Sequence, residues 1–378
     1  MRERPKKHFT PRANWINDPN GLIFHAGQYH LFFQHNPFEN KWGHMSWGHA
    51  VSKDLINWTE LNVAIAEQPD HAIFSGSAVF DKENERLVAI YSGHRGGNQS
   101  QYLAFSYDNG NTWDGNIKVL DLNMADFRDP KVFRYNDKWI MSVVKSKELK
   151  VSFFESTDLF NWNHLSDFHS PEVGDIYECP DLFELDGKWV LIISTNPGGP
   201  AGGSGMHYLI GNFDGKTFTP ESKAKYLDYG PDYYAAVTFN DAPERITIGW
   251  MNNWEYANDS KFETLKTWNG SMSAARKLRI KDGELVQTFI GETKTYKVTT
   301  DNFEFVYKNG ALKFTRAGER LVIDRSELWD SKINTFTVPA VGDLEITALF
   351  DAGSIELSVN GHMVTSLLLV GHDEPVLR

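Results

Sequence analysis

Polar residues that can do chemistry recur along this chain at intervals of about fifty residues. Asp18 lies in NWINDPNG, Asp129 in FRDP and Glu178 in YECPDLF, and the series also includes Ser75 in FSGSA and Asp232 in PDYYAAVTF. The successive intervals are 57, 54, 49 and 54 residues. Carboxylates that lie around one cavity shift each other's pKa values apart. A pair of carboxylates at a glycosidic bond provides the acid and the base or nucleophile that sugar hydrolysis requires. The pattern therefore favours acid and base chemistry on a sugar.

Each of these acids also has an ordinary structural explanation. N-D-P-N-G has the composition of a sharp turn, in which Asp18 would only bond its own backbone. Asp129 has Arg128 and Lys131 as sequence neighbours with which it can pair, and Glu178 can be solvated. These explanations can hold singly, but three acids at the same phase of a repeat favour one shared site.

Two sequence elements repeat with this period. The first is a Ser/Asp/Trp turn, and its copies are SKDLINW (52–58), SYDNGNTW (106–113), STDLFNW (156–162) and the looser GNFDGKTF (211–218). The second is a turn that leads into an alternating, aromatic run, and its copies are AGQYHLFF, ENERLVAIYSG, NDKWIMSVVK, DGKWVLIIST and APERITIGWMN. Alternating runs opened by turn residues are typical of hairpin strands.

The repeats predict an all-β fold with a five-bladed β-propeller over residues 1–290. Hairpins with further strands between them, at a spacing near fifty residues, are characteristic of propeller blades. A β-sandwich is the alternative, but its strands do not recur in four-strand modules. The innermost strands of propeller blades surround a central channel. The recurring polar residues are therefore expected to converge at one end of that channel.

Composition excludes several classes of function. Fifty acidic residues against 38 basic ones give a net charge of −12, which argues against nucleic acid and against a strongly anionic substrate. Cys179 is the single cysteine, which excludes an internal disulfide and any cysteine-based metal site. The histidines show no metal-ligand spacing, so we expect neither a metal nor a cofactor. The 12 Trp, 14 Tyr and 25 Phe suit both sheet surfaces and sugar pockets.

The sequence shows no targeting or membrane segment. MRERPKKHFTP lacks the apolar core of a signal peptide, and no run of 18 apolar residues occurs. We therefore expect no membrane association and a cytoplasmic location, unless the first Met replaces a removed leader and the mature protein is secreted.

The motifs resemble those of glycoside hydrolase family 32, which contains the invertases, inulinases and levanases. NWINDPNG is similar to the nucleophile motif of the family, FRDP to its Arg-Asp-Pro motif and YECPDLF to its Glu-Cys acid/base motif. Further similar segments follow in the family's order: FFQHNP, WGHMSWGHA, FSGSAV, NPGGPAGGSGMHYLIGNFDG and IGWMNNW. The resemblance covers roughly residues 8–290.

The resemblance implies a role for each acid. Asp18 would attack the anomeric C2 of a β-D-fructofuranosyl unit, and Glu178 would first protonate the leaving oxygen and then activate water, with net retention. Asp129 would hold fructose hydroxyls and stabilise the oxocarbenium-like state, while Arg128 keeps Asp129 ionised. The implied sugar-binding residues are Asn17, Gln34, Trp42, Ser75, Arg128, Asp232 and Trp268.

Some of these assignments have structural alternatives. Trp42 and Trp268 could instead be ordinary core aromatics. Gln34 could be a strand residue whose amide is fully hydrogen-bonded within the sheet. Cys179 can be a small buried hydrophobe, although we expect it to pack close enough to Glu178 to tune the acid/base.

The C-terminal part of the chain departs from the family pattern. Family members usually carry a longer C-terminal β-sandwich, whereas residues 291–378 predict a shortened sandwich-like module from alternating segments such as LVIDRS and LFDAGSIELSVNGHMVTSLLLV. This leaves the monomeric and homo-oligomeric states both open. A second departure is Tyr177, where Trp often precedes the Glu-Cys pair.

The resemblance leads to an exo-acting hydrolase that releases terminal fructose from fructans and, less readily, from sucrose. The nearest alternatives are a fructosyltransferase, which uses the same covalent intermediate, and a sucrose-6-phosphate hydrolase. A non-catalytic sugar-binding propeller would be expected to lack one catalytic acid. An inverting five-bladed hydrolase would need carboxyls ~6.5–9.5 Å apart.

Overall fold

The structure, a computed structural model, describes residues 3–259 and 267–378. Within these ranges it is built from β-strands, and its one labelled helical element is a 3-10 turn, η1 (Ser146–Glu148). The prediction of an all-β fold is therefore confirmed. No helix in the described ranges has the length and apolar character needed to cross a membrane.

Five sheets follow one another from residue 14 to residue 289, and in each the strands pair mainly in chain order. The first sheet has β1 (Asn14–His25), β2 (Gln28–Asn36), β3 (Ser46–Ser52) and β4 (Thr59–Glu60), with β20 (Trp268–Asn269) added beside β1. The second has β5 (Ala72–Asp81), β6 (Arg86–Arg95), β7 (Asn98–Ser106) and β8 (Asp114–Met124). The third has β9 (Phe127–Tyr135), β10 (Lys138–Lys145), β11 (Lys150–Ser156) and β12 (Asn163–Phe168).

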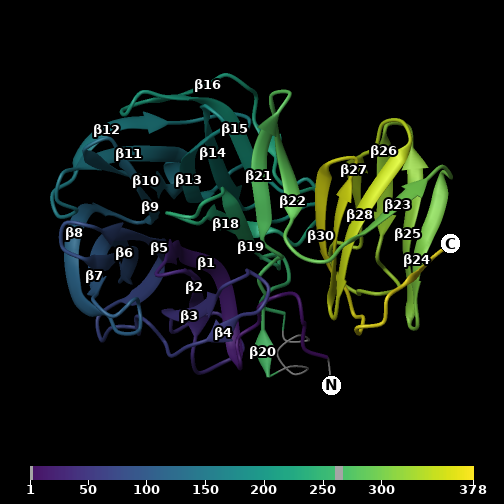
Figure 1. The fold of residues 1–378 in the computed structure, drawn as a ribbon, viewed down its shortest axis with the longest axis horizontal. Coiled ribbons are helices and arrows are strands. Elements are labelled where there is room, and N and C mark those ends of the chain that lie inside the picture. Colours follow the sequence, from purple (N-terminus) through teal and green to yellow (C-terminus); the bar gives the residue numbers. More distant parts are fainter. Residues whose placement is uncertain (1–2, 260–266) are drawn as a thin grey trace.

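The next two sheets continue this pattern. The fourth has β13 (Tyr177–Leu185), β14 (Lys188–Thr195), β15 (Gly205–Phe213) and β16 (Phe218–Pro220), with β17 (Lys225–Tyr226) paired to β15. The fifth has β18 (Tyr234–Thr238), β19 (Ile246–Trp250), β21 (Arg276–Lys281) and β22 (Glu284–Phe289). The first strand of each sheet contacts the first strand of the next, and β18 contacts β1. These five strands therefore contact one another in cyclic order at the centre of the five sheets (Figure 1).

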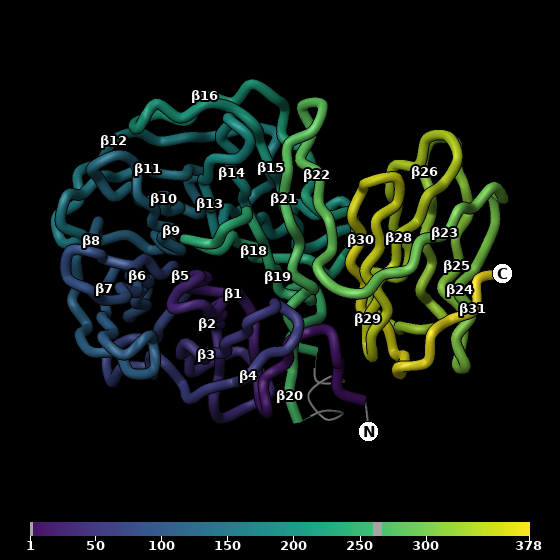
Figure 2. Tube along the Cα trace, viewed as in Figure 1, coloured from purple at the N-terminus to yellow at the C-terminus, as the bar shows by residue number. Residues whose placement is uncertain are grey.

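Two further sheets form the C-terminal part of the chain. One contains β23 (Lys294–Val298), β28 (Leu344–Asp351), β29 (Ser354–Val359) and β30 (His362–Leu367). The other contains β24 (Asn302–Tyr307), β25 (Gly310–Ala317), β26 (Arg320–Asp324), β27 (Thr335–Pro339) and β31 (Val376–Leu377). Both contribute to one buried apolar cluster that includes Phe305, Leu312, Ile346 and Leu357. Figure 2 shows this part beside β21 and β22.

The Ser/Asp/Trp repeat forms the turn between the third and fourth strands of the first three sheets. In each copy the serine hydroxyl donates to the aspartate, as Ser52 does to Asp54 at 3.0 Å. The tryptophan indole N–H then donates to a carbonyl three residues earlier, at 3.2, 3.1 and 2.8 Å in the successive copies. The repeat thus marks the same turn in each of these sheets.

A buried ion network joins the C-terminal sheets to the fifth sheet. The Arg276 guanidinium of β21 donates to Asp228 at 2.9 Å and to Glu356 of β29 at 2.5 Å, and all three side chains are buried. Glu356 also lies 2.8 Å from His8 Nε2, which brings the N-terminal segment into the same network. Removal of one partner would leave a buried charge uncompensated, so the two parts are firmly coupled.

Candidate active site

Three acidic side chains from three different sheets meet around Cys179. Asp18 lies on β1, Asp129 on β9 and Glu178 on β13. The Cys179 Sγ lies 3.5 Å from Asp18 Oδ2, and the Cys179 N–H donates a hydrogen bond of 3.0 Å to Asp129 Oδ2. Glu178 directly precedes Cys179 in the chain. The structure therefore brings these three acids together, as the repeat phase predicts.

The backbone is distorted where the inner strands carry these residues. Strand pairing is irregular in β1 around Asp18 and in β13 just after Glu178. Asp129 and Cys179 have positive φ angles of 63° and 45°. An irregularity of this kind re-aims a side chain, and a strained backbone angle costs on the order of 1–3 kcal/mol. The distortions turn the acids towards one another instead of leaving them on the regular pleat.

Asp18 is a partly exposed carboxylate with donors on both oxygens. The Ser75 hydroxyl donates to Oδ2 at 2.6 Å, and the Asn17 amide donates to Oδ1 at 3.0 Å. Burial raises the pKa of Asp18; the hydrogen bond from Ser75 opposes this rise, and the charge of Glu178 adds to it. The two donors hold the carboxylate in one orientation, which suits a nucleophile.

Asp129 is the most buried of the three acids, with 6% of its surface exposed. Burial raises its pKa to about 7, against the opposing charge of Arg128, and the charges of Glu178 and Asp18 add to the rise. Its own backbone N–H donates to the Ser92 hydroxyl at 2.9 Å. The backbone of Asp129 is thus anchored to β6 of the second sheet, while its carboxylate accepts from the Cys179 N–H.

Arg128 is the cation of the site. Its guanidinium donates to Glu178 Oε1 at 3.0 Å, to the Ser146 hydroxyl at 2.9 Å and to Asp126 at 3.1 Å. Its Nε lies 3.8 Å from Asp129 Oδ2. Burial alone would lower the pKa of Arg128, but the charges of Glu178 and Asp129 raise it overall. The site therefore holds one fixed positive charge among its acids.

Glu178 is partly exposed and has a second donor that sequence reasoning missed. The Tyr234 hydroxyl at the start of β18 donates to Glu178 Oε2, and the Tyr234 side chain is buried. Burial and the charge of Glu178 raise the pKa of Tyr234 well above its usual range, so the hydroxyl keeps its proton. Tyr234 stands two residues after Asp232 in PDYYAAVTF, so the repeat phase identified its strand but not its side chain.

The other predicted residues lie at different distances from the acids. Asn17, Ser75 and Arg128 contact the carboxylates directly. Gln34 is buried, and its amide donates to Asn20 Oδ1 and to the Ile73 carbonyl, both at 3.0 Å. Trp42 is 44% exposed, and its ring centroid lies 6.0 Å from that of Phe74, the neighbour of Ser75. Trp42 is therefore a surface aromatic and not a core residue.

The structure does not bring Asp232 into this cluster. Asp232 is fully buried, its Oδ2 accepts from Arg325 at 2.5 Å and from the Leu367 N–H at 2.8 Å, and its Oδ1 accepts from the Tyr256 hydroxyl. These partners tie it to the C-terminal sheets, where a sugar in the cluster would not reach its occupied oxygens. The repeat phase placed the residue correctly near β18, but the side chain points the other way.

Trp268 also differs from the expectation. It lies in β20 beside Asn14, at the start of β1, with 7% of its surface exposed. The Arg4 guanidinium covers its ring at 4.0 Å from the centroid. This packing matches the alternative of a core aromatic better than that of a sugar contact.

The described residues contain no group of three or more His, Cys, Asp or Glu side chains arranged to hold a metal ion. The reactive groups of the cluster are the three carboxylates, one guanidinium, the Ser75 and Tyr234 hydroxyls and the Cys179 thiol. Burial raises the pKa of that thiol well above its usual value, and the charges of Asp129 and Asp18 add to the rise. The cysteine therefore packs as a neutral group between two acids. The arrangement is suited to acid, base and nucleophilic chemistry by carboxylates.

Comparison with known families assigns the chain to one of them. The family described as glycosyl hydrolases family 32, N-terminal domain, matches residues 8–288. The chain belongs to this family. Family 32 membership agrees with the resemblance drawn from NWINDPNG, FRDP and YECPDLF.

Individual relatives support the assignment. A levanase from Bacillus subtilis (strain 168) is 36% identical over 97% of this chain and 66% of its own length. An extracellular exo-inulinase from Meyerozyma guilliermondii is 39% identical over 73% of this chain and 59% of its own length. The chain thus spans less than two thirds of the length of either relative. The solved structure of a beta-fructofuranosidase from Schwanniomyces occidentalis, complexed with fructosyl-erythritol, has a TM-score of 0.84 at 29% identity and covers 100% of this chain and 96% of that chain.

Proposed function

We propose that this chain is a retaining glycoside hydrolase that releases terminal β-D-fructofuranosyl units from fructans and from sucrose. The observation that carries the proposal is the meeting of Asp18, Asp129 and Glu178 around Cys179, with Arg128 as their shared cation. The names of the levanase and the exo-inulinase support fructan as the substrate class.

The reaction proceeds by double displacement. An Asp18 carboxylate oxygen attacks C2 of the fructosyl unit, the bond from C2 to the leaving oxygen breaks, and Glu178 gives that oxygen its proton. Glu178 then takes a proton from water, whose oxygen attacks C2 and displaces Asp18. Direct attack requires the two carboxyls to be ~5–5.5 Å apart. Cys179 follows Glu178 in the chain, and its Sγ lies 3.5 Å from Asp18 Oδ2. This contact supports a short distance between the two carboxyls.

The remaining groups act on charge and orientation. Asp129 accepts hydrogen bonds from fructose hydroxyls and stabilises the positive charge that develops at C2 in the transition state. Arg128 favours the ionised form of Asp129 and fixes Glu178 through its hydrogen bond of 3.0 Å. Asn17 and Ser75 orient the nucleophile, and Gln34 and the exposed Trp42 border the sugar.

We also infer the architecture that positions the site. The five sheets of residues 1–290 are the blades of a five-bladed β-propeller, and residues 291–378 are a β-sandwich module. The cyclic contacts of β1, β5, β9, β13 and β18 support the propeller, and the shared apolar cluster of the last two sheets supports the sandwich.

Transfer of fructose to another sugar is the nearest alternative, because the same fructosyl-enzyme serves both reactions. The test is a timed incubation of purified protein with sucrose, inulin and levan that resolves free fructose from oligosaccharides. Asp18→Ala is the inactive comparison, and Asp137→Ala, at an exposed position between β9 and β10, is the matched control. Release of free fructose by the wild-type protein but not by Asp18→Ala supports exo-hydrolysis. Longer oligosaccharides indicate transfer. The absence of product from all three substrates rules the proposal out.

A further inference from the structure

A cavity lies at the opposite end of the inner strands from the acids. It has a volume of about 610 Å³ and is lined by the last residues of β5, β9 and β13 and by the segment after β18. In β13, Glu178 is the second residue and Glu184, which lines the cavity, is the eighth. Asp181 is the lining residue of β13 nearest to Glu178, about 10 Å along the strand. None of the described residues that line the cavity belongs to the catalytic cluster, so the two are separate.

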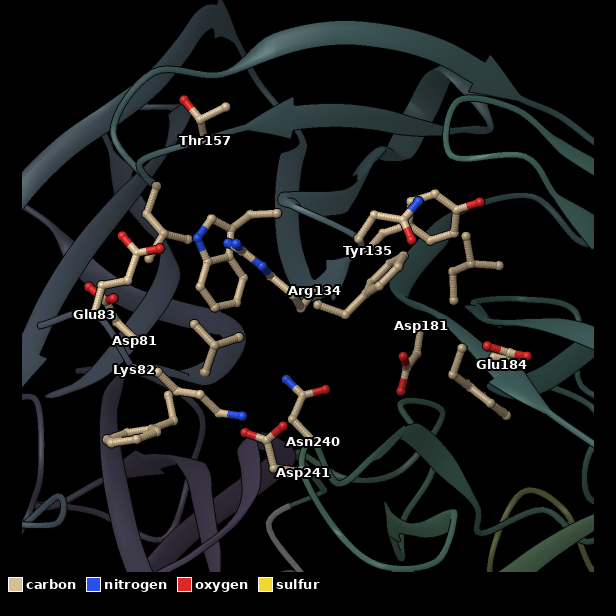
Figure 3. A pocket seen from close by; sticks show the side chains of 18 of the residues that line it. Asp81, Lys82, Glu83, Arg134, Tyr135, Thr157, Asp181, Glu184, Asn240 and Asp241 are labelled. Atoms are coloured by element: carbon tan, nitrogen blue, oxygen red, sulfur yellow. The ribbon is translucent and has the colours of Figure 1, made fainter. Parts of the chain in front are cut away.

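The cavity walls combine charges of both signs with aromatic rings (Figure 3). Acidic side chains outnumber basic ones, which disfavours an anion. Lys82, Arg134 and Arg245 in the same walls disfavour a strongly cationic ligand. Trp139 and Trp189 also line the cavity. Such a mixture suits a neutral ligand with many hydroxyl groups.

Asp181 supplies an acceptor without a partner. The Asp181 side chain is fully buried, and its Oδ2 accepts from the Thr238 N–H at 2.6 Å and the Thr238 hydroxyl at 2.8 Å and lies 3.2 Å from Lys131 Nζ. Its Oδ1 has no hydrogen-bond partner among the described residues. Figure 3 shows this carboxylate directed into the cavity. An unpaired buried acceptor is unfavourable, and a bound O–H group would supply the missing hydrogen bond.

Arg245 supplies a donor on the same wall. Among the described residues its guanidinium makes only long hydrogen bonds, at 3.4–3.5 Å, to Thr238 Oγ1 and to the carbonyls of Phe239 and Glu184. A ligand oxygen can therefore approach it more closely than any present partner. A hydroxyl is both donor and acceptor, so it can serve Asp181 and Arg245 together.

We propose that this cavity is a second saccharide site, which binds a neutral sugar of one or two units. One sugar hydroxyl donates to Asp181 Oδ1, and a sugar oxygen accepts from Arg245. The volume falls within the ~300–1,000 Å³ typical of small-molecule pockets. The choice of a sugar among neutral polar ligands rests on the proposed function. The pairing of a ligand hydroxyl with Asp181 and Arg245 is independent of it.

The test counts sugar molecules bound at equilibrium. Radiolabelled sucrose is dialysed against full-length protein that carries Asp18→Asn, which prevents cleavage. The same background then receives Arg245→Gln, with Arg279→Gln as a matched control at an exposed arginine of β21 outside the cavity. Asp181→Asn is a second cavity variant, checked for folding by circular dichroism because it also alters the pair with Lys131.

The result expected is two sucrose molecules per chain in the Asp18→Asn background and in the Arg279→Gln control, and one fewer in Arg245→Gln. Equal binding in Arg245→Gln and Arg279→Gln would overturn the proposal. Failure of the proposed function is a separate result, because it appears as wild-type protein that releases no fructose from sucrose. A crystal of the Asp18→Asn protein grown with sucrose locates the second sugar: density beside Asp181 supports the site, and its absence there contradicts it.

Discussion

Arg128 Nη2 donates a hydrogen bond of 3.0 Å to Glu178 Oε1, although the two residues belong to different sheets. The same guanidinium lies 3.8 Å from Asp129, its neighbour in sequence. One cation therefore serves two acids for which we propose different roles. A planar guanidinium can do this because its donors diverge in a fixed plane, whereas an ammonium is a single point of charge.

Arg128→Lys is expected to lower kcat/KM for sucrose on the order of a hundredfold, which corresponds to about 3 kcal/mol. Lysine keeps the charge but cannot bond Glu178, Ser146 and Asp126 at the same time. Steady-state kinetics measure the effect, and Arg279→Lys is the control at an exposed position. Unchanged kinetics in Arg128→Lys would show that only the charge at this position matters.

Asp129→Asn is expected to lower kcat by about 10²–10³-fold, because it removes the negative charge that stabilises the transition state. The amide has nearly the same shape, so the Cys179 N–H keeps an acceptor. Rates are measured above pH 7, where the wild-type carboxyl is ionised. A variant with near-normal kcat would contradict the role proposed for Asp129.

The same variant is expected to gain stability at high pH. The pKa of Asp129 is raised from 3.8 to about 7 by burial, so the folded protein binds this proton more tightly than the unfolded chain does. The contribution of Asp129 to the free energy of unfolding therefore falls as pH rises from about 4 to about 7, by up to roughly 4 kcal/mol. Asp129→Asn has no such proton to lose and does not show this decrease. Urea unfolding of both proteins near pH 5 and near pH 8 tests the sign. A stability difference that stays constant with pH would refute it.

His8 is expected to stabilise the protein below neutral pH. It is buried between Asp351 at 3.0 Å and Glu356 at 2.8 Å; burial alone would lower its pKa, but these two acids raise it from 6.5 to about 9. The contribution is full below pH 6.5 and is lost as pH rises to about 9. His8→Gln should therefore be less stable near pH 6, by up to about 3 kcal/mol, with the gap narrowing towards pH 9. Thermal unfolding across this range checks the trend, and a gap that widens with pH would contradict it.

Asp232 gives a test that separates a structural role from a sugar contact. Arg325→Ala removes the partner of a fully buried carboxylate and is expected to cost about 3–5 kcal/mol. Asp232→Asn is expected to lower the unfolding temperature with no change in KM for sucrose. A raised KM in stably folded Asp232→Asn would restore the sugar contact that the repeat phase suggested.

Much of the site could be predicted because a repeat converts sequence distance into spatial position. Asp18, Ser75, Asp129 and Glu178 share a phase, and they do meet. The phase specifies the strand and the end of the strand, but not the direction of one side chain where the strand is irregular. Asp232 and Tyr234 show this limit: Asp232 precedes β18 and pairs with Arg325, whereas the Tyr234 hydroxyl, two residues later, donates to Glu178.

Contacts that cross between sheets could not be predicted from local patterns. The pair of Asp232 with Arg325 joins residues 93 positions apart, and no periodicity relates them. The Arg4 guanidinium over Trp268 is a similar case, since the N-terminal segment covers a ring that lies 264 positions later in the chain. Burial by a distant segment is a tertiary property, so a sequence pattern could not separate Trp268 from the exposed Trp42.

The central claim, that Asp18 forms a covalent fructosyl-enzyme, is tested most directly by mass spectrometry of Glu178→Ala. An aryl β-D-fructofuranoside has a leaving group that needs no acid, so the variant should be fructosylated but hydrolysed slowly without its base. The predicted result is a mass increase of one fructosyl unit on the peptide that contains Asp18. Release of fructose with no adduct, or an adduct on another carboxylate, would contradict the account.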